Sequence, residues 1–489
     1  MNKTTLALAL CAAILGAGCA TSPMPEAPAM AANATPANAS PHPLVARIVA
    51  EVSAVRIEAR VRRLVAFGTR HTLSDTVSDT RGIGAARRWI HAELQACAAA
   101  SGGRLQVVND AHTTAKSERL PAGVEVVNIV ATLPGSDPQA RERILVVSGH
   151  YDSRNSDNAD AQGDVPGAND DASGTAATME LACVMARHSF PATLVFMAVA
   201  GEEQGLIGAD FWAARAKREG LKIEAMITND IIGSPVGDTG QRDARQVRLF
   251  ADGLSPLLRM ALGHGPTSPP SAANDAVLAS VRQQLEAQVR TGGAADFGAN
   301  QLGRYLKEAG ERYLPGFSVN LIQRPDRFLR GGDHLPFLNR GYAAVRFTEP
   351  FENFMRQHQN VRTENGRSYG DLPDFVDFGY VADVARINAA GLASLALAPA
   401  APRNAVVETA ELTNDTTLRW DAGRESDITG YRVLWRDTGS MSWQGQRDVG
   451  RVTRATLVGL SKDNLIFGVQ ALGRDGVASL ASYPFPARR

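Results

Sequence analysis

The sequence predicts an α/β protein with a mostly parallel central sheet, helices on both faces, and a second, all-β unit at the C-terminus. Between residues 44 and 397, helical stretches alternate with short apolar runs, and four runs are nearly continuous in hydrophobicity: 124–133, 143–149, 192–200 and 224–228. Continuous hydrophobicity is typical of strands buried on both faces, and alternation with helices is typical of parallel sheets. After residue 402, short alternating strands predict a sandwich over residues 402–489.

Length and charge narrow the possible functions. A chain of 489 residues exceeds the usual size of one hydrophobic core, so we expect at least two folded domains. Its 51 basic and 51 acidic residues cancel. Without a net positive field, we expect no nucleic-acid partner and no attraction to an anionic membrane surface.

Residues 1–19 are predicted to be an export signal. Lys3 gives a positive start, and the apolar run 6–17, which is too short to span a membrane, ends in small residues before Cys19. Residues 15–19 also resemble a bacterial lipobox, although Gly16 stands where such motifs usually carry Leu. Simple cleavage and a lipid anchor at Cys19 both stay open. Either outcome gives an exported protein: periplasmic, secreted, or an outer-membrane lipoprotein.

The next segment, 20–43, is rich in Ala, Pro, Ser and Asn, which predicts a disordered tether. Folding is expected to begin near Leu44, where apolar residues start to recur at helical spacing. After processing, Cys97 and Cys183 remain, and an oxidising compartment could join them. We expect two separately buried thiols instead, because free cysteine is among the most buried residue types.

Polar side chains stand where the predicted strands end. His150, Glu202 and Asp230 each follow an apolar run, and the loop that carries His358 follows a further predicted strand at 343–347. In parallel α/β sheets, ligands collect at the carboxyl ends of the strands. Any one of these residues alone could be a solvated loop residue, but their combination predicts a site at that edge of the sheet.

Four motifs occur in order after these runs: Gly149-His-Tyr-Asp-Ser153, Gly167-Ala-Asn-Asp-Asp-Ala-Ser-Gly174, Ala200-Gly-Glu-Glu-Gln-Gly205 and Asn229-Asp230. Their order resembles that of the co-catalytic zinc peptidases of the bacterial leucyl aminopeptidase type (clan MH, peptidase family 28), over about residues 120–390. The resemblance implies a zinc-dependent aminopeptidase that acts on peptides and holds two Zn²⁺ per chain.

The resemblance also implies a ligand set. His150 and Asp230 would bind one ion, Glu203 and His358 the other, and Asp170 would bridge both. Zinc accepts such nitrogen and oxygen ligands, and a bridging carboxylate offsets the repulsion between two dications. His358 is followed by Gln, where relatives generally have Thr.

Other residues of the motifs would support the ligands. Glu202 would stay free of metal as the general base that passes a proton to the leaving amine. Asp152, two residues after His150 on an extended chain, would orient the imidazole.

The resemblance implies a cis peptide bond between Asp170 and Asp171, and the plain alternative for this motif is a helix N-cap. Asp333 and His334 match a further family segment and are expected near the metals, with a helix cap as the alternative. Phe328 and Leu329 stand where family aminopeptidases often carry a tyrosine that stabilises the oxyanion.

Two other functions remain possible. Glutaminyl-peptide cyclotransferases share this fold with a single zinc, and the segments 150–153, 230–233 and 333–337 are similar to theirs. Asp171 favours the peptidases, because cyclases typically have Ser at that position. A non-catalytic cell-surface binding protein is the alternative outside enzymology. The number of bound zinc ions would distinguish all three.

The C-terminal unit resembles a fibronectin type III domain. The resemblance rests on Trp420 and on the alternating segments 431–435 and 465–471, with Leu465 where such domains usually carry a tyrosine. The sequence indicates no partner for this unit. The segment 265–299, rich in Pro, Ser, Ala and Gln, is predicted to be an insertion in the first unit.

Overall fold

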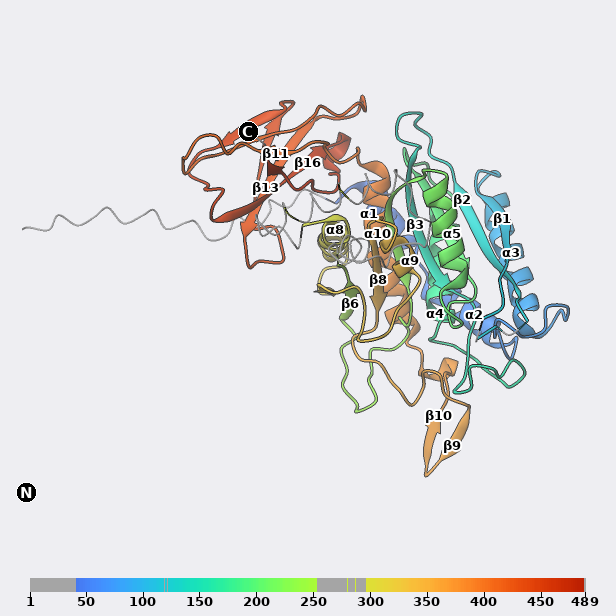
Figure 1. Cartoon of the computed structure of the whole chain (residues 1–489). Helices are drawn as coiled ribbons and strands as arrows, with labels where there is room; N and C mark the ends of the chain where they lie inside the picture. Colours follow the sequence, from blue (N-terminus) through green and yellow to red (C-terminus); the bar gives the residue numbers. More distant parts are fainter. Residues whose placement is uncertain are drawn as a thin grey trace, which may run out of the picture.

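The computed structural model describes residues 41–487, apart from residues 118, 121, 253–278, 280–285 and 287–295. The predicted export signal, the tether up to residue 40, and nearly all of the predicted insertion therefore lie outside the described residues. The described chain forms an α/β unit and a smaller β unit (Figure 1). Among the described residues, no helix is long and apolar enough to cross a lipid bilayer.

The α/β unit is built on an eight-stranded sheet with the order β1-β2-β4-β3-β5-β8-β6-β7. Its strands are β1 (Gln106–Thr113), β2 (Glu125–Leu133), β3 (Arg143–His150), β4 (Thr193–Val199), β5 (Lys222–Asn229), β6 (Gln246–Phe250), β7 (Ser318–Ile322) and β8 (Ala344–Thr348). The central strands β4, β3, β5 and β8 are parallel. The pairs β1-β2, β2-β4 and β6-β8 are antiparallel. The predicted mostly parallel sheet is confirmed.

Helices cover both faces of this sheet (Figure 1). They are α1 (Pro43–Glu51), α2 (Ala54–Val65), α3 (Gly82–Ala100), α4 (Ala172–Met185), α5 (Ile207–Arg218), α8 (Gly298–Tyr313), α9 (His334–Leu338) and α10 (Phe378–Leu397), with a short 3-10 turn η1 (Pro373–Phe375). A small hairpin, β9 (Arg362–Glu364) and β10 (Arg367–Tyr369), projects from the unit. Helices α4 and α10 are buried almost all round, as their apolar and small residues require.

The first predicted helical segment forms two helices, α1 and α2. Where the sequence indicates one helical stretch from residue 44, the chain breaks at Val52, and Ser53 caps α2 by accepting a hydrogen bond from the amide of Arg56. Glu180 of α4, fully buried, accepts hydrogen bonds from the amide of Ser53 and from the guanidinium groups of Arg56 and Arg60. This buried carboxylate therefore anchors the N-terminal helices to the central one.

Helices α3 and α4 are joined by a disulfide between Cys97 and Cys183, whose Cα atoms lie 5.1 Å apart. The expectation of two separate thiols was wrong. The two cysteines are 86 residues apart in the chain, and only the packing of α3 against α4 brings them together.

The C-terminal unit is a sandwich of two sheets, with the orders β15-β12-β11-β17 and β14-β13-β16. Its elements are β11 (Val406–Val407), β12 (Thr416–Arg419), β13 (Gly430–Asp437), β14 (Gly445–Gly450), β15 (Arg454–Leu457), β16 (Leu465–Leu472), the turn η2 (Arg474–Gly476) and β17 (Phe485–Pro486). Leu418, Trp420, Val433 and Val469 pack between the sheets. The predicted sandwich is present, and its resemblance to fibronectin type III domains stays a prediction.

The sandwich lies against α8 (Figure 1), and a buried ion-pair cluster joins the two units. Asp296, just before α8, contacts Arg304 of α8 at 3.2 Å and Arg436 of β13 at 2.5 Å. Both guanidinium groups also lie over the ring of Trp443, and the Nε atom of Arg304 donates to the carbonyl of Met441. Because all three charged side chains are buried, this contact fixes the sandwich to the α/β unit.

Candidate metal centre

The site forms at the carboxyl ends of the central strands. His150 is the last residue of β3, Glu203 follows β4, and Asp230 follows β5. Asp170 immediately precedes Asp171, the N-cap of α4, and His358 lies in the loop after β8. Since β4, β3, β5 and β8 run parallel, their ends meet at one edge, and the structure brings together all five residues that the sequence singled out as ligands.

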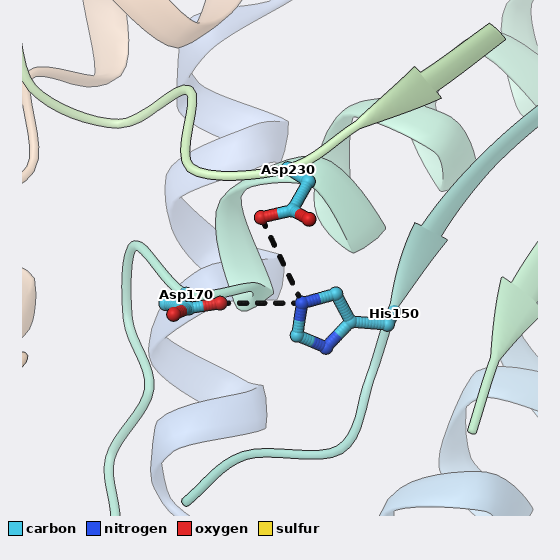
Figure 2. A group of neighbouring side chains, drawn as sticks. All are labelled: His150, Asp170 and Asp230. Atoms are coloured by element: carbon cyan, nitrogen blue, oxygen red, sulfur yellow. Dashed lines mark ion pairs between the residues drawn. The ribbon is translucent and has the colours of Figure 1, made fainter. Parts of the chain in front are cut away.

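His150, Asp170 and Asp230 form one group, and Figure 2 shows the imidazole facing both carboxylates. The Nε2 atom of His150 lies 3.2 Å from Oδ1 of Asp170 and 3.9 Å from Oδ1 of Asp230. All three side chains are buried. The Nε2 atom of His150 has no hydrogen-bond partner in the described part of the chain, although it is aimed at two anionic groups.

Asp170, Glu203 and His358 form a second group that shares Asp170 with the first. The Nε2 atom of His358 lies 2.9 Å from Oδ2 of Asp170 and 3.1 Å from Oε1 of Glu203. This Oε1 atom is buried without a hydrogen-bond partner among the described residues. Unpartnered nitrogen and oxygen donors of this kind suit zinc, whose protein ligands are imidazole nitrogen and carboxylate oxygen.

The peptide bond between Asp170 and Asp171 is cis, as predicted. Asp171 also caps α4, because its Oδ1 atom accepts a hydrogen bond from the amide of Gly174. The cis peptide bond and the helix cap therefore occur together. Its Oδ2 atom accepts from the amide of His150. The side chain therefore connects the end of β3 to the start of α4, within the site.

Asp152 lies behind His150, where the sequence predicts it. The Nδ1 atom of His150 is 3.2 Å from the carbonyl oxygen of Asp152 and 3.6 Å from its Oδ1 atom. The carboxylate also accepts hydrogen bonds from the amides of Glu202 and Glu203. One buried carboxylate thus positions an imidazole and the backbone of both glutamates.

Glu202 stands apart from the two groups, at the edge of the first. Its Oε2 atom lies 4.0 Å from Nε2 of His150, and its side chain is 12% exposed. Within the described part of the chain its carboxylate accepts no hydrogen bond, and the contact that Glu202 makes is through its backbone amide. Burial raises the pKa of Glu202 well above its usual range, although the nearby His150 opposes that rise.

Asp170 has the opposite electrostatic environment. Burial alone would raise its pKa, but His358 and His150 outweigh burial and hold the pKa of Asp170 well below the usual range. The ionised form is the form that binds a cation. The ionised carboxylate of Asp170 is therefore available as an anionic ligand common to both groups.

Asp333 and His334 are both buried near this edge. Asp333 precedes α9 but makes no side-chain cap, so its capping alternative was wrong. Its carboxylate oxygens have no hydrogen-bond partner within the described residues, and burial raises the pKa of Asp333 to about 8. The Nε2 atom of His334 contacts the carbonyl of Pro325 at 2.6 Å. Within the described residues, no hydrogen bond or ion pair joins Asp333 or His334 to a proposed ligand, and their supporting role stays a prediction.

Sequence reasoning missed several residues that hold the ligands in place. Arg346 of β8, fully buried, contacts Oδ1 of Asp230 at 2.9 Å. Asp371 accepts hydrogen bonds from the amides of Asn169 and Asp170. A charge inside the otherwise apolar run 343–347 was the available signal for Arg346. Asp371 lies in a polar loop 201 residues from Asp170, and no sequence signal marked it.

Arg154 is another residue that the sequence did not single out. Its Nε atom donates to Oε2 of Glu203 at 2.7 Å, and its Nη2 atom lies 2.5 Å from Nδ1 of His358. It thereby touches two members of the second group. Arg154 directly follows the first motif, but nothing in its spacing marks it.

This chain is similar in sequence to known peptidases. Residues 128–248 match the family model described as peptidase family M28. A protein of Leptosphaeria maculans, named as a probable zinc metalloprotease, is 46% identical over 447 residues, which cover 91% of this chain and 98% of that protein.

Solved structures show weaker likenesses. LapB from Legionella pneumophila has a TM-score of 0.49 and 16% identity, over 75% of this chain and 78% of that one. Porphyromonas gingivalis glutaminyl cyclase has a TM-score of 0.45 and 16% identity, over 70% of this chain and 98% of that one. At these scores, neither likeness assigns an activity. The extended sequence identity to the fungal relative does decide the family: this chain belongs to the zinc metalloproteases of peptidase family M28.

Proposed function

We propose that this metallopeptidase is an exopeptidase, and specifically an aminopeptidase, that removes N-terminal residues from peptides with two zinc ions. The observation that carries the proposal is the pair of three-residue groups that share Asp170. A site for one ion needs only one such group. Two groups with a common carboxylate would provide for two adjacent ions, and Asp170 would be the ligand common to both.

In this proposal, His150 and Asp230 would hold one ion, and Glu203 and His358 would hold the other. When bound, a zinc pair supplies Lewis acidity toward the scissile carbonyl and the attacking water. Asp152 keeps His150 in its binding orientation through the contacts at Nδ1.

Glu202 is the proposed general base. Its carboxylate is next to the first group, partly open to solvent, and uncommitted to any hydrogen bond in the described part of the chain. It takes a proton from the attacking water and delivers it to the nitrogen of the leaving amine. Asp333 and Asp371 are the proposed supporting residues. Asp371 accepts hydrogen bonds from the amides of Asn169 and Asp170.

The two alternatives fit less well. A glutaminyl-peptide cyclotransferase with a single zinc would leave one of the two groups without an ion. Asp171, which ties His150 to α4, also stands where cyclases typically have Ser. A non-catalytic binding protein is disfavoured by membership in a zinc metalloprotease family.

We also propose that the protein is exported, either released by cleavage or anchored by lipid at Cys19. The disulfide between Cys97 and Cys183 supports export, because disulfides persist in oxidising compartments outside the cytoplasm. Mass spectrometry of the mature N-terminus distinguishes the two outcomes. An unmodified, unprocessed N-terminus recovered from whole cells would contradict export.

The activity can be tested on purified protein of known zinc content. Amino-acid p-nitroanilides, glutaminyl peptides and N-terminally blocked peptides are incubated with the enzyme, with and without a chelator. We expect two zinc ions per chain, chelator-sensitive hydrolysis of free-amino substrates, and no hydrolysis of blocked ones. Cyclised product from glutaminyl peptides, with one zinc per chain, would identify the cyclotransferase instead. Cleavage that starts at the C-terminus of a blocked peptide would identify a carboxypeptidase.

A further inference from the structure

A cleft separates part of α8 from the sandwich, beside the buried cluster of Asp296. Its volume is about 660 Å³, within the size range of small-ligand sites. Residues of α8 form one wall, and residues of the sheet β14-β13-β16 form the other. The cleft shares no lining residue with the two metal-binding groups, so it is a second concave surface of the molecule.

This cleft lies at the end of the central sheet opposite the metal centre. Ser394 of α10 lines it, and the neighbouring carbonyl of Leu395 accepts a hydrogen bond from Arg143, the first residue of β3. His150, at the metal centre, is the last residue of the same strand. A molecule bound in the cleft would therefore leave the metal centre open.

The sheet wall of the cleft is the outer face of the sandwich. Along β13, Val433 packs between the two sheets, whereas Arg432 and Leu434 line the cleft, as the alternation of a strand requires. Gln446 of β14 pairs with Leu434, and Gln470 of β16 pairs with Arg432. These side chains form one patch across three strands that faces the residues of α8.

Several planar polar groups in the cleft have unused hydrogen-bonding capacity. Among the described residues, the carboxyl of Glu308 and the side-chain amide of Gln446 make no hydrogen bond or ion pair. The Nε2 atom of Gln470 donates to the carbonyl of Ser479. Burial raises the pKa of Glu308 to about 7, so near neutral pH its carboxyl can both donate and accept.

The packed part of the junction between the two units contrasts with this cleft. There, Asp296 contacts Arg304 and Arg436, and Trp443 lies against both guanidinium groups. A contact that only fixes two units is expected to be packed in this way throughout. The cleft instead keeps an open volume between polar groups whose hydrogen bonds are not made within the described chain, as a binding site does.

Three aromatic side chains complete the lining: Trp443, Tyr305 and Tyr313. The hydroxyl of Tyr305 donates to the carbonyl of Ala478, and that of Tyr313 accepts from the amide of His42. Because both hydroxyls already have partners, the tyrosines offer mainly the apolar surface of their rings.

The charged side chains of the cleft balance, with three cations and three anions: Lys307, Arg312, Arg432, Glu308, Glu311 and Asp475. A cleft with no net charge does not select an ion. Planar hydrogen-bonding groups beside aromatic rings suit a neutral ring that carries hydroxyl groups. The hydroxyls pair with the amides and the carboxyl, and the C–H face of the ring packs on the aromatic surface.

We propose that this cleft binds a neutral saccharide chain, with Glu308 and Gln446 as hydrogen-bonding residues and the aromatic side chains as the apolar wall. The bound saccharide holds the peptidase on glycan-bearing material while its metal centre stays open to peptides. This inference goes beyond the proposed peptidase function and does not depend on the number of zinc ions.

The test is calorimetric titration of the purified, zinc-loaded protein with three neutral oligosaccharides: cellohexaose, N-acetylated chitohexaose and maltohexaose. We expect at least one of them to bind, with one molecule per chain. Spermine and a heparin-derived hexasaccharide carry the opposite kinds of charge, and neither should bind in place of the neutral sugars.

Variants locate the binding in the cleft. Glu308→Ala and Gln446→Ala each remove one hydrogen-bonding group and should weaken saccharide binding by about tenfold. Gln446→Trp fills the cleft and should abolish binding. The matched control is Glu58→Ala, which removes a glutamate from α2, and the affinity should not change. Thermal unfolding checks that each variant is folded, and hydrolysis of a p-nitroanilide should be unchanged in all four.

Each contrary outcome bears on a stated claim. Failure of all three neutral oligosaccharides to bind would overturn the proposal, and binding of spermine or the heparin fragment alone would overturn the ligand class. Unchanged saccharide affinity in Glu308→Ala and Gln446→Trp would place the binding outside this cleft. Zinc content and hydrolysis of the unmodified protein test the peptidase function separately, so the two proposals can fail independently.

Discussion

Asp171 accepts a hydrogen bond from the backbone amide of His150 at 3.0 Å, and through its other oxygen one from the amide of Gly174 at 2.9 Å. The second oxygen also accepts from the amide of Ile231 at 3.3 Å, next to Asp230. Asp171 is not itself a proposed metal ligand. Its side chain thus holds in place the backbone at two proposed ligands, His150 and Asp230. The motif combines helix capping and site assembly in one carboxylate.

Asp171→Ala should lower both stability and zinc binding. It leaves three buried amides without their acceptor, which we expect to reduce the free energy of unfolding by about 2–4 kcal/mol. Urea unfolding and zinc analysis measure the two effects. Asp171→Asn keeps one acceptor oxygen and should lose less; equal losses in both variants would show that hydrogen bonding is not the cause.

Glu202→Gln should separate catalysis from metal binding. Because the amide cannot accept the proton, kcat should fall by about 10²–10⁴-fold, while zinc content stays at the level of the unmodified enzyme. Steady-state kinetics with a p-nitroanilide and elemental analysis of the same sample give both values. Near-normal turnover would mean that another group is the base.

Asp170→Ala should have the opposite pattern. Both groups lose their common member, so neither position keeps its full set of ligands, and zinc content should fall below one ion per chain. Elemental analysis after gel filtration measures this loss. Full zinc content in a folded variant would contradict the bridging role.

The disulfide should contribute strongly to stability. It links residues 86 positions apart, and for a loop of that length the entropy model gives about 4–5 kcal/mol. We expect the double variant Cys97→Ser/Cys183→Ser to show that loss in denaturant unfolding. Adding a reductant should destabilise the unmodified protein and leave the double variant unaffected. A reductant-insensitive natural protein would show that the bond does not form.

Asp296→Asn should loosen the sandwich from the α/β unit. The substitution removes the buried charge that both Arg304 and Arg436 contact, which we expect to reduce stability by about 3–5 kcal/mol. The matched control is Asp448→Asn, which removes a carboxylate that is 57% exposed and paired with Arg432; there we expect little change. Calorimetric unfolding of both variants compares them. Equal effects would mean that the buried cluster does not hold the units together.

The apolar strands were predictable because a strand buried on both faces must be apolar along its length, whatever its neighbours. Residues 143–149 and 224–228 correspond to β3 and β5 within one or two residues. Strand β1 was not predicted. It pairs only with β2 at the sheet edge and exposes much of its length, so it has no such pattern.

The amino-acid sequence alone predicts which polar residues stand at the ends of the strands, and hence which residue types meet at one edge of the sheet. His150 is the last residue of β3, Asp230 directly follows β5, and Glu203 lies shortly after β4. Tertiary structure decided the rest: the disulfide, the contacts of Arg154, Arg346 and Asp371, and the docking of the sandwich on α8. Those contacts join residues far apart in the chain. Unlike the burial of apolar residues in strands and helices, they follow no periodic pattern that can be read from the sequence.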